Sequence, residues 1–142
     1  MTDRLSPAEA LPRIRSIIDS GGSCRLVVTG SSMEPFLRNE RDAVILSPAV
    51  RPPRRGDIIF YERSGGQFVL HRVTGTGPDG SLLLCGDAQT GLEPVSASQI
   101  VAAVSRIERG GKQFSAGAPL WRLLSLFWIM LRPVRARLPI RR

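Results

Sequence analysis

The sequence DIIFYERSGGQFVLHRVT, residues 57–74, predicts a β-hairpin. Two runs of β-branched and aromatic residues flank a Ser-Gly-Gly segment at 64–66. A short connection that contains glycine between two such runs is typical of paired antiparallel strands. Prolines at positions 48, 52 and 53 interrupt the chain ahead of the first run, so we expect that strand to begin near Asp57. The second run carries His71, which is the one histidine of the protein.

Short apolar segments on both sides of this hairpin extend the strand pattern. Further strands are predicted at 26–28, 43–46, 82–85 and 100–107. The chain holds 14 glycines and 11 prolines in 142 residues, a content that favours many turns over a helical bundle. Six short strands at this spacing predict one mostly β domain, at residues 24–109, built as a small, bent antiparallel sheet or barrel.

The first 23 residues predict a helix that packs on this domain. Ser6 is a candidate N-cap, Pro7 suits the first helical position and Glu9 closes a capping box. Apolar residues follow at helical spacing, although Pro12 could kink the helix or delay its start. They are Leu11, Ile14, Ile17 and Ile18. No apolar signal peptide precedes the helix, so we expect a cytoplasmic protein, peripheral at the membrane if it meets one.

Residues 110–142 predict a linker, an apolar helix and a basic tail. The net charge of +8 arises entirely after residue 108, where eight basic residues stand without an acid. The apolar run at 120–131 is shorter than the roughly 20 residues that a membrane span needs. Two tryptophans near arginines are typical of a helix lying on a membrane surface, so residues 120–142 could contact a membrane. The alternative is a helix packed on the domain or on a second subunit, and the oligomeric state stays open.

Two short segments hold candidate catalytic groups. Gly30-Ser31-Ser32-Met33-Glu34-Pro35 follows the strand at 26–28 and places hydroxyls on a tight turn. A serine hydroxyl becomes a useful nucleophile when a neighbouring base takes its proton. His71 is the side chain whose ordinary pKa suits that task near neutral pH. The alternatives are an ordinary serine turn and a histidine with a structural role.

Four motifs resemble, in order and rough spacing, those of the signal peptidase I family. They are Gly30-Ser31-Ser32-Met33-Glu34-Pro35, Arg55-Gly56-Asp57-Ile58-Ile59-Phe60, His71-Arg72-Val73 and Gly86-Asp87. The similarity covers about residues 24–109. Bacterial members carry a lysine base where this chain has His71, so the resemblance is to the archaeal and endoplasmic-reticulum branch.

The resemblance implies a serine endopeptidase with the fold of that family. Ser32 would be the nucleophile, His71 the general base, and Asp87 or Glu93 the acid that orients the imidazole. Gly30, Ser31, Met33 and Pro35 would shape the oxyanion and substrate site around Ser32. The implied substrate is a precursor protein with a leader or signal-type peptide. No membrane anchor is evident and Phe36 stands where the family often has threonine, so a dedicated precursor is a better candidate than general secretory substrates.

Other classes are less well supported by the residues. A non-catalytic binding module with this fold and a self-cleaving regulator are the alternatives, although the single N-terminal helix does not suggest a DNA-binding helix-turn-helix. One histidine with Cys24 and Cys85 far apart lacks the spacing of a zinc site, so we expect no metal. No phosphate-binding loop is evident and no cofactor is expected. No aromatic ladder accompanies the arginines, so we expect no nucleic acid partner.

Overall fold

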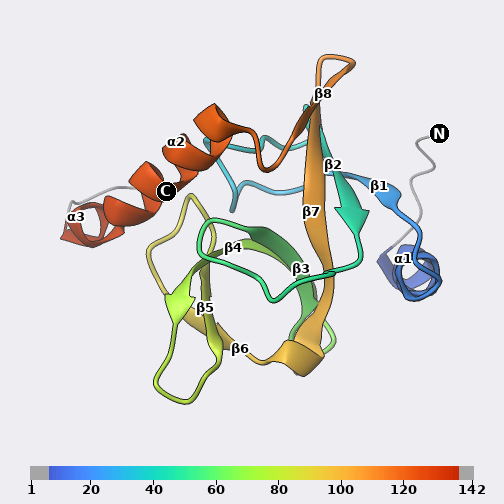
Figure 1. Cartoon of the computed structure of the whole chain (residues 1–142), viewed down its shortest axis with the longest axis horizontal. Coiled ribbons are helices and arrows are strands. Elements are labelled where there is room, and N and C mark those ends of the chain that lie inside the picture. Colours follow the sequence, from blue (N-terminus) through green and yellow to red (C-terminus); the bar gives the residue numbers. More distant parts are fainter. Residues whose placement is uncertain (1–6, 138–142) are drawn as a thin grey trace.

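Strands β3 (Ile58–Glu62) and β4 (Phe68–Thr76) form the predicted hairpin in the computed structural model, which describes residues 7–137. They join one open antiparallel sheet of eight strands (Figure 1). The remaining strands are β1 (Cys24–Val27), β2 (Asp42–Ser47), β5 (Leu82–Cys85), β6 (Glu93–Val95), β7 (Ile100–Arg109) and β8 (Lys112–Ser115). The prediction of a mostly β chain with an antiparallel sheet is therefore confirmed.

The order of the strands is β1-β2-β7-β3-β4-β5-β6, and β8 pairs with β7 beside this path. The sequence did not predict β6, a three-residue strand, or β8, which lies where a linker was expected. Gly110 and Gly111 both adopt positive φ and form the turn that leads from β7 into β8. Residues 110–115 therefore extend the sheet before the chain reaches its C-terminal helices.

The sheet bends because its strand pairs shift register at several points. Shifts occur between Ile45 and Leu46, between Phe60 and Tyr61, and between Val73 and Gly75. Such irregularities raise the local twist and let a sheet curl. The curl buries both faces of β3, which explains its continuous apolar sequence.

Two hydrophobic clusters lie on opposite faces of the curled sheet. On β3, Ile58 and Phe60 enter the cluster that also includes Ile14 and Ile18 of the N-terminal helix. Its alternate residues Ile59 and Tyr61 enter a second cluster, which is completed by Val69, Val73, Leu84 and Val95. The alternation of side chains along a strand thus directs Tyr61 into the same interior as the β4 residues Val69 and Val73.

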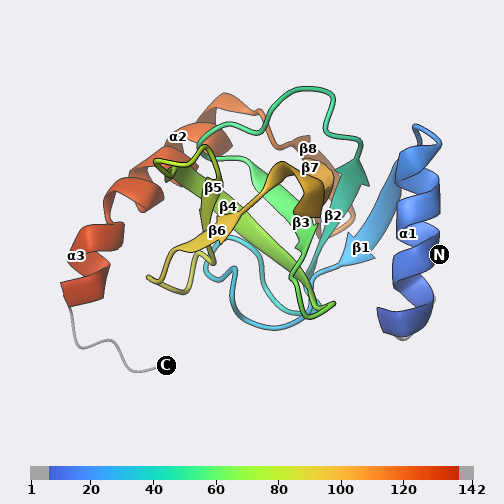
Figure 2. The same ribbon diagram turned by 90° about the horizontal axis from the view of Figure 1, so that it is seen from below.

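Helices lie at the two ends of the sheet. Helix α1 (Pro7–Asp19) is at one end, and α2 (Pro119–Met130) and α3 (Arg132–Arg137) are at the other (Figures 1 and 2). A short 3-10 helix, Ala97–Gln99, precedes β7. Pro12 is accommodated inside α1. The predicted cap at Ser6 lies outside the described residues.

A buried ion pair joins β4 to the loop after β5. Arg72 donates from Nε and Nη2 to the two carboxylate oxygens of Asp87 over 2.8 and 2.7 Å, and both side chains are almost fully buried. Arg72 also donates to the carbonyl oxygen of Gly56 over 2.9 Å. The guanidinium carbon lies 4.7 Å from the ring centre of Phe36 and 6.0 Å from that of Trp121. The pair is therefore enclosed by hydrogen bonds and aromatic faces.

We expect Asp87→Ala to lower the free energy of unfolding by about 3–5 kcal/mol, because it leaves the Arg72 charge buried without a partner. Urea denaturation followed by circular dichroism measures the effect. The double variant Arg72→Leu/Asp87→Leu should lose less free energy of unfolding than the summed losses of the single variants Arg72→Leu and Asp87→Leu. Additive losses would show that the two side chains are not energetically coupled.

Candidate active site

The loop between β1 and β2 presents Ser32. Gly30 adopts a φ of 80°, which favours glycine, and its N–H donates to the side-chain oxygen of Asn39 over 2.9 Å. Met33 is 2% exposed and packs in the core, so it anchors the loop rather than lining an open pocket. Ser32 is half-buried, and Pro35, which follows a cis peptide bond, is exposed. The loop therefore holds the hydroxyl-bearing residue between a buried anchor and an exposed turn.

His71 lies within β4, where it pairs with Ile59 of β3 and is 3% exposed. Its Nδ1 lies 3.2 Å from the hydroxyl oxygen of Tyr61, within hydrogen-bonding distance. Tyr61 is a diagonal neighbour on the same face of the β3–β4 ladder, a relation that brings long side chains into contact. The contact at Nδ1 thus comes from a tyrosine, where the sequence suggested an acid.

The Ser32 backbone and the His71 ring both lie close to Gly86, in the loop after β5. A methyl group at Gly86 would lie 2.6 Å from the Ser32 carbonyl oxygen and 3.1 Å from Nε2 of His71. It would also lie 2.8 Å from the side-chain oxygen of Gln89. The Ser32 carbonyl oxygen accepts a hydrogen bond from the N–H of Ala88 over 2.9 Å, which fixes the serine loop on the Gly86 loop. The tertiary structure therefore brings two predicted site residues, almost forty positions apart, to one place.

Glu93 acts on Tyr61 and His71 through its charge. Arg63 holds the Glu93 carboxylate with both Nε and Nη2, the shorter bond being 2.7 Å. The hydrogen bonds from Arg63 keep the pKa of Glu93 below its usual range, and a hydrogen bond with Tyr61 acts in the same direction. Burial, together with the charge of Glu93 and the hydrogen bond to it, raises the pKa of Tyr61. Glu93 is therefore ionised and Tyr61 is protonated, and the Tyr61 hydroxyl lies beside the imidazole of His71.

Asp87 has a different position from the one expected of an acid that orients His71. Both of its carboxylate oxygens accept hydrogen bonds from Arg72, whose side chain points to the other face of β4. The backbone carbonyl of Asp87 accepts from Nε1 of Trp128 over 2.8 Å and from Arg135 over 3.0 Å. Asp87 is thus occupied by Arg72, whereas Glu93 acts on His71 through its negative charge.

The surroundings of His71 set its charge. Burial lowers the pKa of His71 to about 4; the positive charge of Arg63 acts in the same direction and the negative charge of Glu93 opposes it. The imidazole is therefore neutral at neutral pH, which is the form that a general base requires.

Tyr61 was missed by sequence reasoning, although a signal for it was present. It is the single tyrosine of the chain and ends the apolar run of β3. Its proximity to His71 depends on the hairpin register, which pairs Ile59 with His71 and Tyr61 with Val69. A one-residue slip would move Tyr61 to the opposite face relative to His71.

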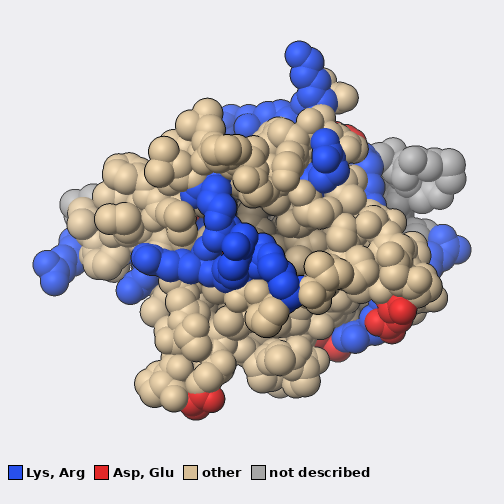
Figure 3. Space-filling view, viewed as in Figure 1, with Lys and Arg blue, Asp and Glu red and all other residues tan. Residues whose placement is uncertain are grey.

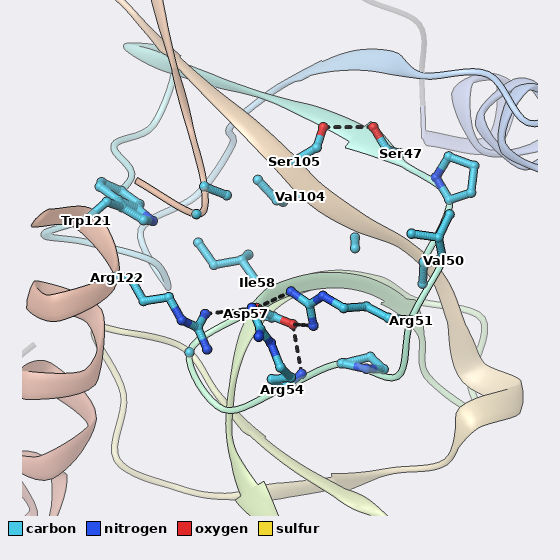
Figure 4. Close-up of a pocket in the computed structure, with 17 residues that line it drawn as sticks. Ser47, Val50, Arg51, Arg54, Asp57, Ile58, Val104, Ser105, Trp121 and Arg122 are labelled. Carbon is cyan, nitrogen blue, oxygen red and sulfur yellow. Dashed lines mark hydrogen bonds and ion pairs between the residues drawn. The ribbon is translucent and has the colours of Figure 1, made fainter. Parts of the chain in front are cut away.

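A pocket of about 230 Å³ lies away from Ser32 and His71, neither of which lines it (Figure 4). Asp57 sits on its wall and accepts hydrogen bonds from the side chains of Arg51 and Arg122 and from the N–H of Arg54. These contacts show Asp57 as an anchor for the turn ahead of β3.

The stability of the protein should depend on His71 under mildly acidic conditions. Folding lowers the pKa of His71 from 6.5 to about 4, so the unfolded chain binds a proton that the folded chain does not bind between these values. This stability is present above the unfolded pKa and is lost as the pH falls toward 4. When the pH falls from about 7 to about 4.5, we expect the free energy of unfolding of the wild type to fall by about 2 kcal/mol more than that of His71→Asn. Urea titrations of both proteins measure this, and equal losses would contradict it.

Comparisons with protein-family models and with curated proteins find no match for this chain. The interpretation of the site therefore depends on the motifs in the sequence and on the geometry around Gly86.

Proposed function

We propose that the protein is a serine endopeptidase of the signal peptidase type, which cleaves a leader or signal-type peptide from a precursor. One observation carries the proposal: the Ser32 backbone carbonyl oxygen and Nε2 of His71 both lie beside Gly86, 2.6 and 3.1 Å from the position that a Cβ would take there. Two further features support it. His71 is neutral at neutral pH, and its Nδ1 lies within hydrogen-bonding distance of the Tyr61 hydroxyl, on which the charge of Glu93 acts.

In this proposal, Glu93 and Tyr61 determine which ring nitrogen of His71 carries the proton. Ionised Glu93 can only accept, so the Tyr61 hydroxyl donates to it and its oxygen is left to accept from Nδ1–H of His71. Nε2 then carries no proton and is available on the side of the ring that borders Gly86 and the Ser32 loop. In this arrangement Tyr61 is a positioning residue, and Glu93 acts through it.

The proposed reaction proceeds in two steps through an acyl-enzyme. Ser32 Oγ attacks the carbonyl carbon of the scissile peptide while its proton moves to Nε2 of His71. The backbone N–H of Ser32, with the Gly30-Ser31 segment, stabilises the oxyanion. The His71 proton passes to the leaving nitrogen as the C–N bond breaks. Water then attacks the acyl carbon while one of its protons moves to the same Nε2. The bond between this carbon and Ser32 Oγ breaks, His71 returns the proton to Oγ, and the new carboxylic acid leaves and ionises.

We expect a fluorophosphonate probe to label the wild type at Ser32, because the probe reports a serine activated by a base. Ser32→Ala should abolish labelling, and His71→Ala should slow it on the order of 10³-fold or more, because the members of such a catalytic unit act together. Mass spectrometry of the labelled peptide identifies the site. Ser64→Ala, at an exposed serine of the β3–β4 turn, is the matched control. Absence of labelling in the wild type would instead favour a non-catalytic binding module.

Tyr61→Phe tests the orientation of the base. It keeps the ring in the core and removes the oxygen that accepts from Nδ1–H. We expect kcat to fall about 10- to 100-fold with little change in KM, a loss in the range of a general acid–base contribution. The imidazolium form of His71 loses a hydrogen-bond acceptor, while the charges of Arg63 and Glu93 still act on it. This loss lowers the pKa of His71, so the acidic limb of the kcat/KM profile should move to lower pH. The readout is hydrolysis of a leader-derived peptide across a pH series.

A loss of activity from Tyr61→Phe without a move of the acidic limb would indicate a packing effect. Unchanged kcat and an unchanged limb would reject the role of Tyr61 and leave the Ser32–His71 assignment in place.

A further inference from the structure

Helix α2 exposes a continuous apolar face. Leu120, Leu123, Phe127 and Met130 are 69%, 66%, 56% and 66% exposed, and Leu124 lies beside them at 47%. Their spacing of three and four residues places them on one side of the helix. Isolated exposed apolar residues are common on soluble proteins, but a contiguous stripe marks an interaction surface.

The opposite side of α2 is occupied by the domain. Ser125 and Ile129 are buried, and Trp121 packs edge-on against Phe36 with ring centres 5.3 Å apart. Trp128 donates to the backbone of Asp87. Both tryptophans therefore face the protein, whereas the sequence suggested that they contact a membrane. The exposed face of α2 consists instead of leucines, a phenylalanine and a methionine.

The charged residues of the two C-terminal helices all have one sign. The charged residues of α2 and α3 are Arg122, Arg132, Arg135 and Arg137, and no acid follows residue 108. Arg55, which is exposed, lines a hollow together with Met130 and Arg132. On the face seen in Figure 3, basic side chains form a band across the middle, whereas acidic side chains lie only toward the edges. The two helices thus contribute only cations beside the apolar stripe, of which Arg122 is paired with Asp57.

We propose that the exposed face of α2 and α3 binds an anionic membrane surface. An apolar helix face bordered by arginines matches the acyl boundary and negative headgroups of such a surface. A second copy of the chain fits less well, because two-fold pairing brings the same arginines together. Helix α2 has 12 residues, so it is about 18 Å long and would lie along the surface. No helix among the described residues is long and apolar enough to span a membrane.

The same two helices hold the loop on which Ser32 rests. Arg135 donates to the backbone carbonyls of Asp87 and Gln89, and Arg132 donates to that of Thr90. Trp128 adds its bond to Asp87. A membrane contact made by the outer side of α2 would therefore keep the Gly86 loop close to the surface. The membrane proposal does not depend on the proposed peptidase activity, because it concerns the outer side of the helix.

Vesicle co-sedimentation of the full chain tests the proposal. We expect binding to vesicles that contain phosphatidylglycerol, weaker binding at high salt, and little binding to pure phosphatidylcholine. Leu123→Gln/Phe127→Gln should weaken binding on the order of tenfold or more, because it removes two inserted side chains. Val50→Gln, at a residue that is 93% exposed outside the stripe, is the matched control and should bind as the wild type does. Arg55→Ser/Arg137→Ser should weaken binding to the anionic vesicles without changing the apolar face.

Two results would overturn the proposal. One is a wild type that stays in the supernatant with anionic vesicles at low salt. The other is a dimer, measured by light scattering, that Leu123→Gln/Phe127→Gln converts to a monomer, since this would show that a second copy covers the face. All of these substitutions are at solvent-facing positions, so thermal unfolding midpoints close to that of the wild type should accompany them.

Discussion

The buried ion pair between Arg72 and Asp87 links the two elements that bring His71 and Ser32 together in the proposed site. Arg72 follows His71 on β4, and Asp87 follows Gly86 in the loop that supports Ser32. The pair therefore fixes the strand that carries the base against the loop that supports the nucleophile. A charge enclosed in this way is costly to leave unpaired, so the two elements cannot separate without exposing it to water. The aromatic cover of the pair includes Trp121, and this residue extends the same constraint to α2.

Burial and hydrogen bonding give the titratable groups near Gly86 different states. Burial keeps His71 neutral, while the contacts with Arg63 keep Glu93 ionised. Tyr61 lies between them as a protonated phenol. Environments that separate the pKa values of neighbouring groups are typical of acid–base sites. The arrangement differs from a simple serine, histidine and acid triad, because a phenol stands between the imidazole and the carboxylate. The larger reach of tyrosine lets a carboxylate on β6 influence a histidine on β4.

The C-terminal helices are two-sided. Their inner side contributes Trp121, Trp128 and Arg135 to the packing around the Gly86 loop, and their outer side exposes leucines with cationic neighbours. Phe36 has a role in this packing, because its ring contacts Arg72 and Trp121. The same helices thus support the proposed catalytic centre and offer a surface for association.

Local sequence alone determined the hairpin at 57–74, the mostly β character of the chain, and Ser32 and His71 as candidates, because alternation, turn residues and reactive side chains are local properties. The local sequence did not predict the short strands β6 and β8, because three or four residues form a strand only when a neighbouring strand supplies their hydrogen bonds. The different surroundings of Asp87 and Glu93 also depend on the tertiary structure. Both acids lie at plausible distances along the sequence. Arg72 occupies Asp87, while the β3–β4 register places Tyr61 beside His71, where the charge of Glu93 acts on both groups. Strand register and ion pairing join residues far apart in the chain, and a linear pattern does not specify those contacts.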